Sequence, residues 1–225
     1  YDGFIITRNG HYVGIGSAHD LMGTITEMQI QAARYANPLT QLPGNVPINE
    51  HIERLLKSRV AFHACYFDLD HFKPFNDVFG YRKGDDIIVL LAQTLVEIAN
   101  PSADFCGHIG GDDFMVLFQS DDWEARCREA MRLFDSRLAA SVDGRLLADQ
   151  GYTAENRRGQ MVFYALPALS IGALPVGIDV FESHREVSAA AAEAKKNAKR
   201  TSGSSLFIER RQRQVAATAA PSSEV

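Results

Sequence analysis

The sequence predicts a mixed α/β (α+β) fold, in which helices pack on a layered sheet and one antiparallel hairpin carries acidic residues. Segments rich in aromatic and β-branched residues alternate along the chain with segments of helical apolar spacing, which indicates this architecture. A Gly-Gly pair separates two apolar runs near the middle, as at the tip of a hairpin. With 225 residues, 46% of them hydrophobic and 23% charged, the chain is long enough to bury one sizeable core.

The bulk properties exclude several classes of protein. The net charge of -5 gives no overall basic field, so we expect no nucleic-acid partner, although a small phosphorylated ligand remains compatible. Cys65, Cys106 and Cys127 are odd in number and lie in apolar segments, which favours reduced thiols in the cytoplasm. No apolar run approaches the roughly 18 residues of a membrane-spanning helix, so no membrane segment is expected.

The N-terminal segment, residues 1–36, is interpreted as the end of a small regulatory domain plus a linker helix. Two short strands flank Asn9-Gly10, a pair that supplies the positive backbone angles of a hairpin turn. A helix begins at Ala18, and its apolar stripe must pack on something. The stripe consists of Leu21, Ile25, Met28 and Ala32. The order of elements resembles the C-terminal half of a CBS motif, and an ordinary N-terminal hairpin is the alternative.

The main domain is predicted over residues 37–209, after a Pro/Gly-rich loop. Asn45 is placed to cap a helix that has Pro47 in its first turn. The next segments are predicted to be a strand over 60–70, a helix over 85–99, a hairpin over 104–118, a helix over 123–140, a strand or strand pair over 161–174, a helix over 184–200 and a strand over 204–208. Residues 210–225 lack periodicity and are predicted to be a disordered tail.

Carboxylates gather at the ends of two predicted strands. Asp68 and Asp70 close the first central strand, and Asp112 and Asp113 occupy the hairpin tip. If the strands are neighbours, these groups lie close together and repel one another unless a cation sits among them. Oxygen ligands without paired His or Cys select Mg²⁺ or Mn²⁺ over zinc, and magnesium usually completes its shell with nucleotide phosphates.

Groups suited to a nucleotide surround this cluster. Gly110 and Gly111 allow close approach to the backbone, and the loop Leu69–Lys73 offers amide N–H groups and one ammonium. Further polar groups suit the edge of a base or the distal phosphates. The candidates for the base are Asn76 and Asp85, and those for the phosphates are Lys195 and Lys199, four residues apart on one helix face.

Two long motifs resemble the GGDEF family of bacterial diguanylate cyclases. They read YFDLDHFKPFNDVFGYRKGDD and HIGGDDF, while NPLTQLPGN and AKKNAK occupy the places of two shorter family segments. The resemblance covers roughly residues 37–208. It implies a ferredoxin-like, nucleotide-cyclase-type sheet and a homodimer with one GTP in each half-site. It also implies Mg²⁺-dependent condensation of two GTP into cyclic di-GMP as a signal, under the control of an upstream regulatory domain.

The resemblance also assigns roles by position. The metal positions match Asp68, the Leu69 carbonyl, Asp112 and Asp113, and the catalytic carboxylates are Asp68, Asp112 and Asp113. The substrate positions match Phe72, Lys73, Asn76, Asp85, Gly110, Gly111, Lys195 and Lys199.

Several positions depart from the family pattern. Asp113 stands in place of a Glu, which retracts the carboxylate by one methylene and predicts slower turnover. His108 and Lys199 each replace an Arg, and Asn37 and Gln41 depart from the first short segment. The family's product-inhibition motif, RxxD, here reads Pro101-Ser-Ala-Asp104, so no inhibition through that site is predicted.

Plainer interpretations stay open. Asp85 suits the N-cap of the helix that follows Gly84, and the two lysines suit a helix C-terminus. Asp70 suits a cap, and Asp112-Asp113 suit a simple turn. His63, His71 and His108 lack metal-ligand spacing and are interpreted as structural. The alternative function is a degenerate GGDEF domain that binds GTP and regulates a linked domain such as a cyclic di-GMP phosphodiesterase, with a purely structural dimerisation unit as a third hypothesis.

Overall fold

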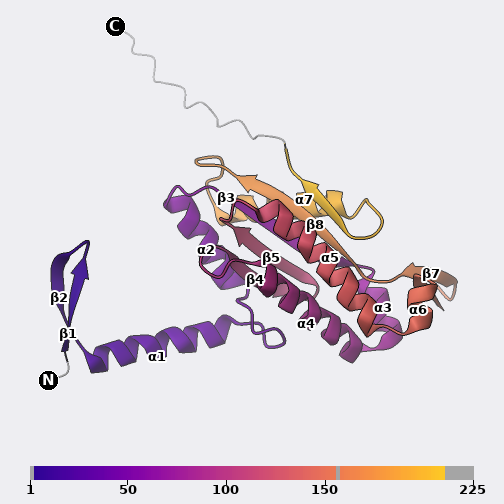
Figure 1. Ribbon diagram of the computed structural model, residues 1–225, viewed down its shortest axis with the longest axis horizontal. Coiled ribbons are helices and arrows are strands. Elements are labelled where there is room, and N and C mark those ends of the chain that lie inside the picture. The colour runs from indigo at the N-terminus through magenta and orange to yellow at the C-terminus, as the bar shows by residue number, and fades with distance from the viewer. Residues whose placement is uncertain (1–2, 156–157, 211–225) are drawn as a thin grey trace, which may run out of the picture.

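A five-stranded sheet forms the centre of the molecule, whose computed structural model describes residues 3–155 and 158–210 (Figure 1). Its strand order is β4-β5-β3-β8-β9, and all neighbours are antiparallel except β8 and β9. The strands are β3 (Phe62–Asp70), β4 (Phe105–Gly110), β5 (Asp113–Phe118), β8 (Ala168–Val176) and β9 (Ser205–Ile208). Strands β3, β4, β5 and β8, together with the helices between them, follow the ferredoxin-like βαββαβ order. This order confirms the expected fold class.

Helices cover both faces of this sheet because side chains alternate along each strand. Phe67, Phe114 and Ile171 point into one core, beneath α4 (Tyr81–Ile98) and α5 (Trp123–Ser141). The intervening positions, such as Tyr66 and Met115, point into a second core. That core lies beneath α2 (Asn45–Lys57) and α7 (His184–Ala198). Helix α3 (Phe72–Phe79) follows directly after the end of β3.

The sheet register places the acidic strand ends side by side. Phe67 pairs with Phe114 in the antiparallel β3–β5 ladder. The next residue along each strand toward this edge is Asp68 on β3 and Asp113 on β5. A two-residue turn, Gly111-Asp112, joins β4 to β5, because Gly110 pairs with Asp113. The two carboxylate-bearing segments therefore end at the same edge of the sheet, as the sequence predicts.

The N-terminal hairpin and helix are also present, but they are not buried. Strands β1 (Gly3–Arg8) and β2 (His11–Ser17) turn at Asn9-Gly10, where φ is 52° and 80°. Helix α1 (Ala18–Tyr35) has no buried residue, and Figure 1 shows it extending away from the sheet together with the hairpin. The expectation that its apolar stripe packs on another element is therefore wrong for the described residues.

Several boundaries differ from the prediction. Helix α4 begins at Tyr81, four residues earlier than expected, and the segment read as a loop after β3 contains α3. The helix α6 (Gly144–Ala148) and the hairpin of β6 (Gly151–Glu155) with β7 (Met161–Ala165) complete the fold, and α6 and β6 were not predicted. The predicted tail lies outside the described residues from 211 onward. Among the described residues, no helix combines the length and apolar character needed to cross a bilayer.

The cap of α2 is Gly44 and not Asn45, for a steric reason. The Gly44 N–H donates to the Tyr35 carbonyl oxygen at 2.8 Å, and a Cβ at residue 44 would lie 2.7 Å from that oxygen. Only glycine fits this approach. Asn45 is the first helical residue instead, and its side-chain amide donates to the Ile109 carbonyl at 3.2 Å.

Candidate functional site

Two carboxylates converge on one ammonium at the acidic edge of the sheet. The Lys195 Nζ atom lies 2.8 Å from Asp68 Oδ2 and 2.8 Å from Asp113 Oδ1. Asp68 lies two residues before the end of β3 and is only 4% exposed, and Lys195 reaches it from α7. The shared lysine proves that oxygens from the two strand ends approach a common cation position.

A second lysine extends the cluster. Lys199 pairs with Asp68, and its Nζ atom lies 3.6 Å from Asp70 Oδ1. The other Asp70 oxygen accepts a 2.6 Å hydrogen bond from the Ser170 hydroxyl on β8. The two lysines thus contact carboxylates across the site and do not serve only to offset the dipole at the end of their helix. Asp70 is bound by Ser170 and does not cap a helix.

The pKa values show that the site is crowded with negative charge. Burial raises the pKa of Asp113 and the neighbouring Asp68 raises it further, while the hydrogen bond from Lys195 acts in the opposite direction. Burial, followed by Asp68, also raises the pKa of Asp112. Burial alone would lower the pKa of Lys195, but its bonds to Asp113 and Asp68 outweigh burial and raise it. An additional cation would relieve this repulsion.

The donor set fits an ion that takes few protein ligands. Within residues 3–155 and 158–210, no group of three or more His, Cys, Asp or Glu side chains is placed to hold a metal. Magnesium is typically bound by one or two carboxylates and completes its shell with water and phosphate oxygens. The convergence of Asp68 and Asp113 is compatible with that mode. The Leu69 side chain is an apolar group buried in the core, and its backbone carbonyl is the only atom of this residue that can serve as a ligand.

The turn that carries the acidic pair has a backbone that requires glycine. Gly110 has φ 150° and Gly111 has φ 60°, values that residues with a Cβ rarely adopt. A Cβ added at either position would meet no heavy atom within 4 Å. Conformation, and not crowding, therefore explains the glycine pair, and the space beside the turn is open to a ligand.

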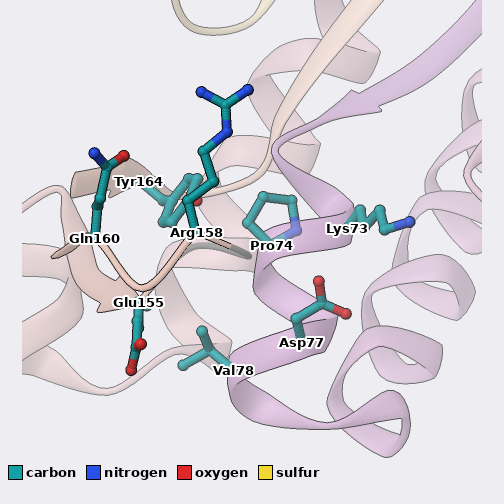
Figure 2. Close-up of a pocket in the computed structure, with 9 residues that line it drawn as sticks. Lys73, Pro74, Asp77, Val78, Glu155, Arg158, Gln160 and Tyr164 are labelled. Carbon is teal, nitrogen blue, oxygen red and sulfur yellow. The ribbon is translucent and has the colours of Figure 1, made fainter. Parts of the chain in front are cut away.

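Helix α3 begins directly after β3 and carries two predicted phosphate contacts. Phe72 is buried in the core, so only its backbone is free to face a phosphate, whereas Lys73 is exposed. Lys73 also lines a cavity of about 440 Å³ between α3 and the β6–β7 hairpin. Figure 2 shows Lys73 and Asp77 on the α3 side of this cavity and Tyr164 on the hairpin side. The acidic cluster lies outside that lining.

The predicted base contacts lie where α3 packs on α4. A Cβ at Gly84 would lie 1.7 Å from Asn76 Oδ1, so glycine at 84 makes room for the Asn76 side chain. That oxygen is buried without a hydrogen-bond partner among the described residues. Asp85 is exposed in the second turn of α4, whose N-cap is Gly80, so the N-cap interpretation of Asp85 is wrong. A buried amide oxygen without a hydrogen-bond partner in the protein is a candidate for contact with a ligand.

Comparison with known proteins decides the family. Residues 35–149, more than half of the chain, match the family described as "Diguanylate cyclase, GGDEF domain". The chain belongs to the GGDEF family. The relatives include the diguanylate cyclase DgcP of Pseudomonas aeruginosa, 33% identical over 108 residues, which are 46% of this chain and 16% of DgcP. The cyclic di-GMP phosphodiesterase NbdA of the same organism is 30% identical over 122 residues, 52% of this chain and 15% of NbdA. The chain thus spans a small part of these relatives.

Solved structures confirm the GGDEF fold. Diguanylate cyclase SiaD of Pseudomonas aeruginosa, in complex with its activator SiaC, has a TM-score of 0.62 at 20% identity, covering 85% of this chain and 68% of SiaD. The coiled coil and GGDEF domain of DgcB from Caulobacter crescentus, in complex with c-di-GMP, has a TM-score of 0.61 at 18% identity, covering 85% of this chain and 94% of that one. At this identity the likeness establishes the fold alone.

Three residues of the GGDEF site escaped sequence reasoning. Ser170 donates a hydrogen bond to Asp70, and the Lys195 Nζ atom lies 4.2 Å from the centroid of the Tyr66 ring. Burial, followed by the charge of Asp113, raises the pKa of the Tyr66 hydroxyl to about 12. A Cβ at Gly172 would lie 2.1 Å from the Lys195 backbone nitrogen, so glycine lets α7 approach β8. An isolated glycine inside a strand is the one signal that pointed to this approach. Ser170 and Tyr66 gave none.

Two further histidines and Asp104 have structural surroundings. His63 stacks on Trp123 with ring centroids 4.2 Å apart, which agrees with a structural role, and His71 takes a left-handed conformation before α3. Asp104 accepts hydrogen bonds from the Asn100 and Ser120 N–H groups at 2.8 and 3.1 Å, which braces the loop before β4. Lack of product inhibition at Pro101 stays a prediction.

Proposed function

We propose that this GGDEF domain binds GTP together with Mg²⁺ and condenses two GTP molecules into cyclic di-GMP. The observation that supports the proposal is the approach of Asp68 and Asp113 to within 2.8 Å of one ammonium nitrogen. Two strand-end carboxylates that share a cation, next to an open glycine turn, can hold a nucleotide-bound ion. Membership of the GGDEF family supports the same reaction class.

The residues divide into three tasks in this proposal. Asp68 and Asp113 hold Mg²⁺, which when bound neutralises the phosphate charge, and Asp112 and the Leu69 carbonyl stay predicted ligands by their positions in the sequence. Lys195 and Lys199 turn from the carboxylates to the distal phosphates once nucleotide is present, because phosphate oxygens offer the ammonium groups an equivalent partner. Asp85 accepts hydrogen bonds from the N–H groups of the guanine edge, and the unsatisfied oxygen of Asn76 supplies a second acceptor there.

The reaction requires two copies of the domain. Each GTP ribose 3′-hydroxyl attacks the α-phosphorus of the other GTP, forms a phosphorus–oxygen bond and releases pyrophosphate as the bond to the bridging oxygen breaks. A carboxylate at the signature turn accepts the hydroxyl proton. The described residues supply one acidic cluster for each chain, so a homodimer has to bring two clusters face to face.

A degenerate, GTP-binding regulatory domain is the second candidate. The side chain of Asp113 is one methylene shorter than the family's Glu, and Lys195 already engages it. The shorter side chain lowers the capacity of Asp113 to reach the ribose hydroxyl, and the ion pair with Lys195 occupies its carboxylate, while the phosphate and base contacts stay in place. One relative of this chain, NbdA, is named a phosphodiesterase.

Incubation of the purified chain with GTP and Mg²⁺, followed by chromatography for cyclic di-GMP, tests the proposal. Calorimetric titration with a non-hydrolysable GTP analogue measures binding separately. Lys195→Met should weaken binding roughly tenfold or more, since hydrogen bonds to charged groups are worth about 1.5–3 kcal/mol. Lys196→Met is the matched control, because Lys196 is exposed on the same helix and forms an ion pair with its helix neighbour Glu193, away from the acidic cluster.

The outcomes separate the two candidates. Cyclic di-GMP formation supports the cyclase. Analogue binding without product rejects the cyclase and supports the regulatory domain. Absence of binding in the presence of Mg²⁺ rejects both.

A further inference from the structure

The chain that leaves α1 folds back on itself before it enters the GGDEF sheet. The Tyr35 carbonyl oxygen, at the last residue of α1, accepts from the Gly44 N–H at 2.8 Å. Inside this fold-back, Asn37 Oδ1 accepts from the N–H groups of Leu39 and Thr40 at 2.9 and 3.2 Å. These local bonds hold Thr40 in a fixed position relative to the end of α1.

Thr40 is joined to the signature turn by one buried side chain. His108 on β4 is 2% exposed. Its Nδ1 atom lies 2.9 Å from the Thr40 hydroxyl, and its Nε2 atom lies 3.0 Å from the Gly111 carbonyl oxygen. The ring therefore spans the distance between the segment after α1 and the turn that carries Asp112.

The chemistry of these partners fixes the tautomer. A carbonyl oxygen only accepts, so Nε2 carries a hydrogen and donates to Gly111. In the neutral ring Nδ1 then accepts from the Thr40 hydroxyl. Burial lowers the pKa of His108, which agrees with a neutral ring. Stacking on Phe114, with centroids 4.0 Å apart and planes 12° apart, holds the ring in place.

The turn is closed by the pairing of Gly110 with Asp113. A Cβ at Gly110 or Gly111 would meet nothing within 4 Å, so the space outside these two glycines is open. Glycine also gives the backbone the widest choice of conformations. The hydrogen bond from His108 to the Gly111 carbonyl thus adds a contact from the core to a turn whose glycines allow several conformations.

We propose that His108 is a positioning residue that holds the signature turn, and with it Asp112 and Asp113, in the orientation that the reaction of the bound magnesium nucleotide requires. Through Thr40, it makes that orientation depend on the segment that follows α1. The inference rests on the proposed function for the purpose of the turn, but not for its rigidity. A movement at the end of α1 is thereby transmitted to the acidic residues through Thr40 and His108.

Nuclear magnetic resonance on the ligand-free full chain tests the rigidity. The ¹⁵N spectrum of the histidines should show His108 as the Nε2–H tautomer. In the unmodified chain the amide order parameters of Gly111 and Asp112 should be about 0.85, as in rigid backbone, and in His108→Phe they should fall below about 0.6. Phenylalanine keeps the stacking on Phe114 and removes both ring hydrogen bonds.

Three further variants separate positioning from general structure. His108→Gln retains a donor that can reach Gly111, so it should restore rigidity in part. Thr40→Val removes only the hydroxyl and should loosen the turn to an intermediate degree. His63→Phe is the matched control, because His63 also stacks on an aromatic ring but lies away from the turn. It should leave the order parameters of the turn unchanged.

Kinetics supply the functional arm. With cyclic di-GMP formation as the assay, His108→Phe should reduce kcat about tenfold or more while the KM for GTP changes less than about threefold, since a misplacement near 1 Å costs on the order of a hundredfold. A turn that stays rigid in His108→Phe and in Thr40→Val, or an Nδ1–H tautomer in the unmodified chain, overturns the inference. If the unmodified chain makes no product, the cyclase proposal fails, and the order parameters still decide the role of His108.

Discussion

At the residue scale, the length of one side chain decides between the two candidate functions. Asp113 reaches Lys195 at 2.8 Å but is one methylene shorter than the family's Glu at this position. Asp113→Glu should raise the turnover number by about tenfold or more if the short carboxylate limits proton acceptance. The comparison of kcat between the two forms checks this. Asp121→Glu, an exposed change outside the cluster, is the control, and equal kcat for Asp113→Glu and the unmodified chain would contradict the explanation.

The raised pKa values of the turn carboxylates predict a pH dependence of Mg²⁺ binding. Burial and the charge of Asp68 raise the pKa of Asp112 above 3.8, the value of an ordinary aspartate, and Asp113 shifts the same way. A raised pKa means that these groups take up protons at a higher pH than exposed aspartates do. The affinity for Mg²⁺ should therefore fall on acidification before the pH reaches 3.8. Calorimetric Mg²⁺ titrations at a series of pH values measure this, and a constant affinity down to that pH would refute it.

Sequence reasoning located the carboxylates but not their partners. Asp68 and Asp70 were predicted to lie near Asp112 and Asp113 because both pairs stand at strand ends, which are set by local composition. The structure shows that Asp113 is the residue that shares Lys195 with Asp68. The contact of Lys195 with Asp113 spans 82 residues, and that of Thr40 with His108 spans 68. No local pattern encodes contacts at such separations, because they depend on how elements pack in three dimensions. The mutual placement of the cluster therefore required the fold.

At the scale of the elements, the packing of α7 on β8 positions both lysines. A methyl group at Gly172 would lie 2.1 Å from the Lys195 nitrogen and 2.5 Å from the Ala194 carbonyl carbon, and neither backbone atom can rotate away. Gly172→Ala should therefore push α7 outward, destabilise the fold by about 1–3 kcal/mol and weaken nucleotide binding. Urea unfolding and the binding titration measure the two effects. Gly144→Ala, where a Cβ meets nothing within 4 Å, should change neither. Equal stability of the two variants would contradict the packing argument.

Element prediction succeeded where periodicity is long and failed where elements are short. The apolar repeat of α4 and α7 runs over several turns, so those helices were found, although the start of α4 was placed four residues late. Helix α3 has only 8 residues and contains Pro74 in its first turn, a position that helices tolerate but that also suits a loop. The stripe on α1 was read correctly as helical, yet a stripe does not reveal whether its partner is present.

At the scale of the whole molecule, the N-terminal hairpin and α1 contribute little to the stability of the GGDEF fold. Helix α1 has no buried residue, whereas Leu95 of α4 is fully buried in the core. Removal of residues 1–34 should therefore change the free energy of unfolding by less than about 1 kcal/mol. Leu95→Ala should cost about 2–5 kcal/mol, as large-to-small core changes do. Thermal unfolding of both forms checks the contrast. A loss of stability on truncation as large as that of Leu95→Ala would show that α1 is part of the folding unit.

The whole architecture was the most predictable level. Alternation along β3 assigns its side chains to two cores, and that alternation is visible in the sequence. The boundary between residues 36 and 37, and the relation of residues 1–36 to a CBS domain, stay predictions. The sequence could not show that the sheet carries helices on both faces, because a single apolar stripe does not specify the face on which its helix lies.

The positive charges of Lys195 and Lys199 offset the negative charges of the carboxylates at the acidic edge of the sheet. Zinc-finger domains unfold when a chelator strips their ion, since binding of the ion supplies much of their folding free energy. Here Asp68 and Asp113 have a built-in counter-charge, so prolonged dialysis against EDTA should leave the circular dichroism spectrum and melting curve unaltered. A collapse of the spectrum under chelation would reveal a structural ion instead. These two lysines therefore allow the domain to stay folded without a bound metal ion.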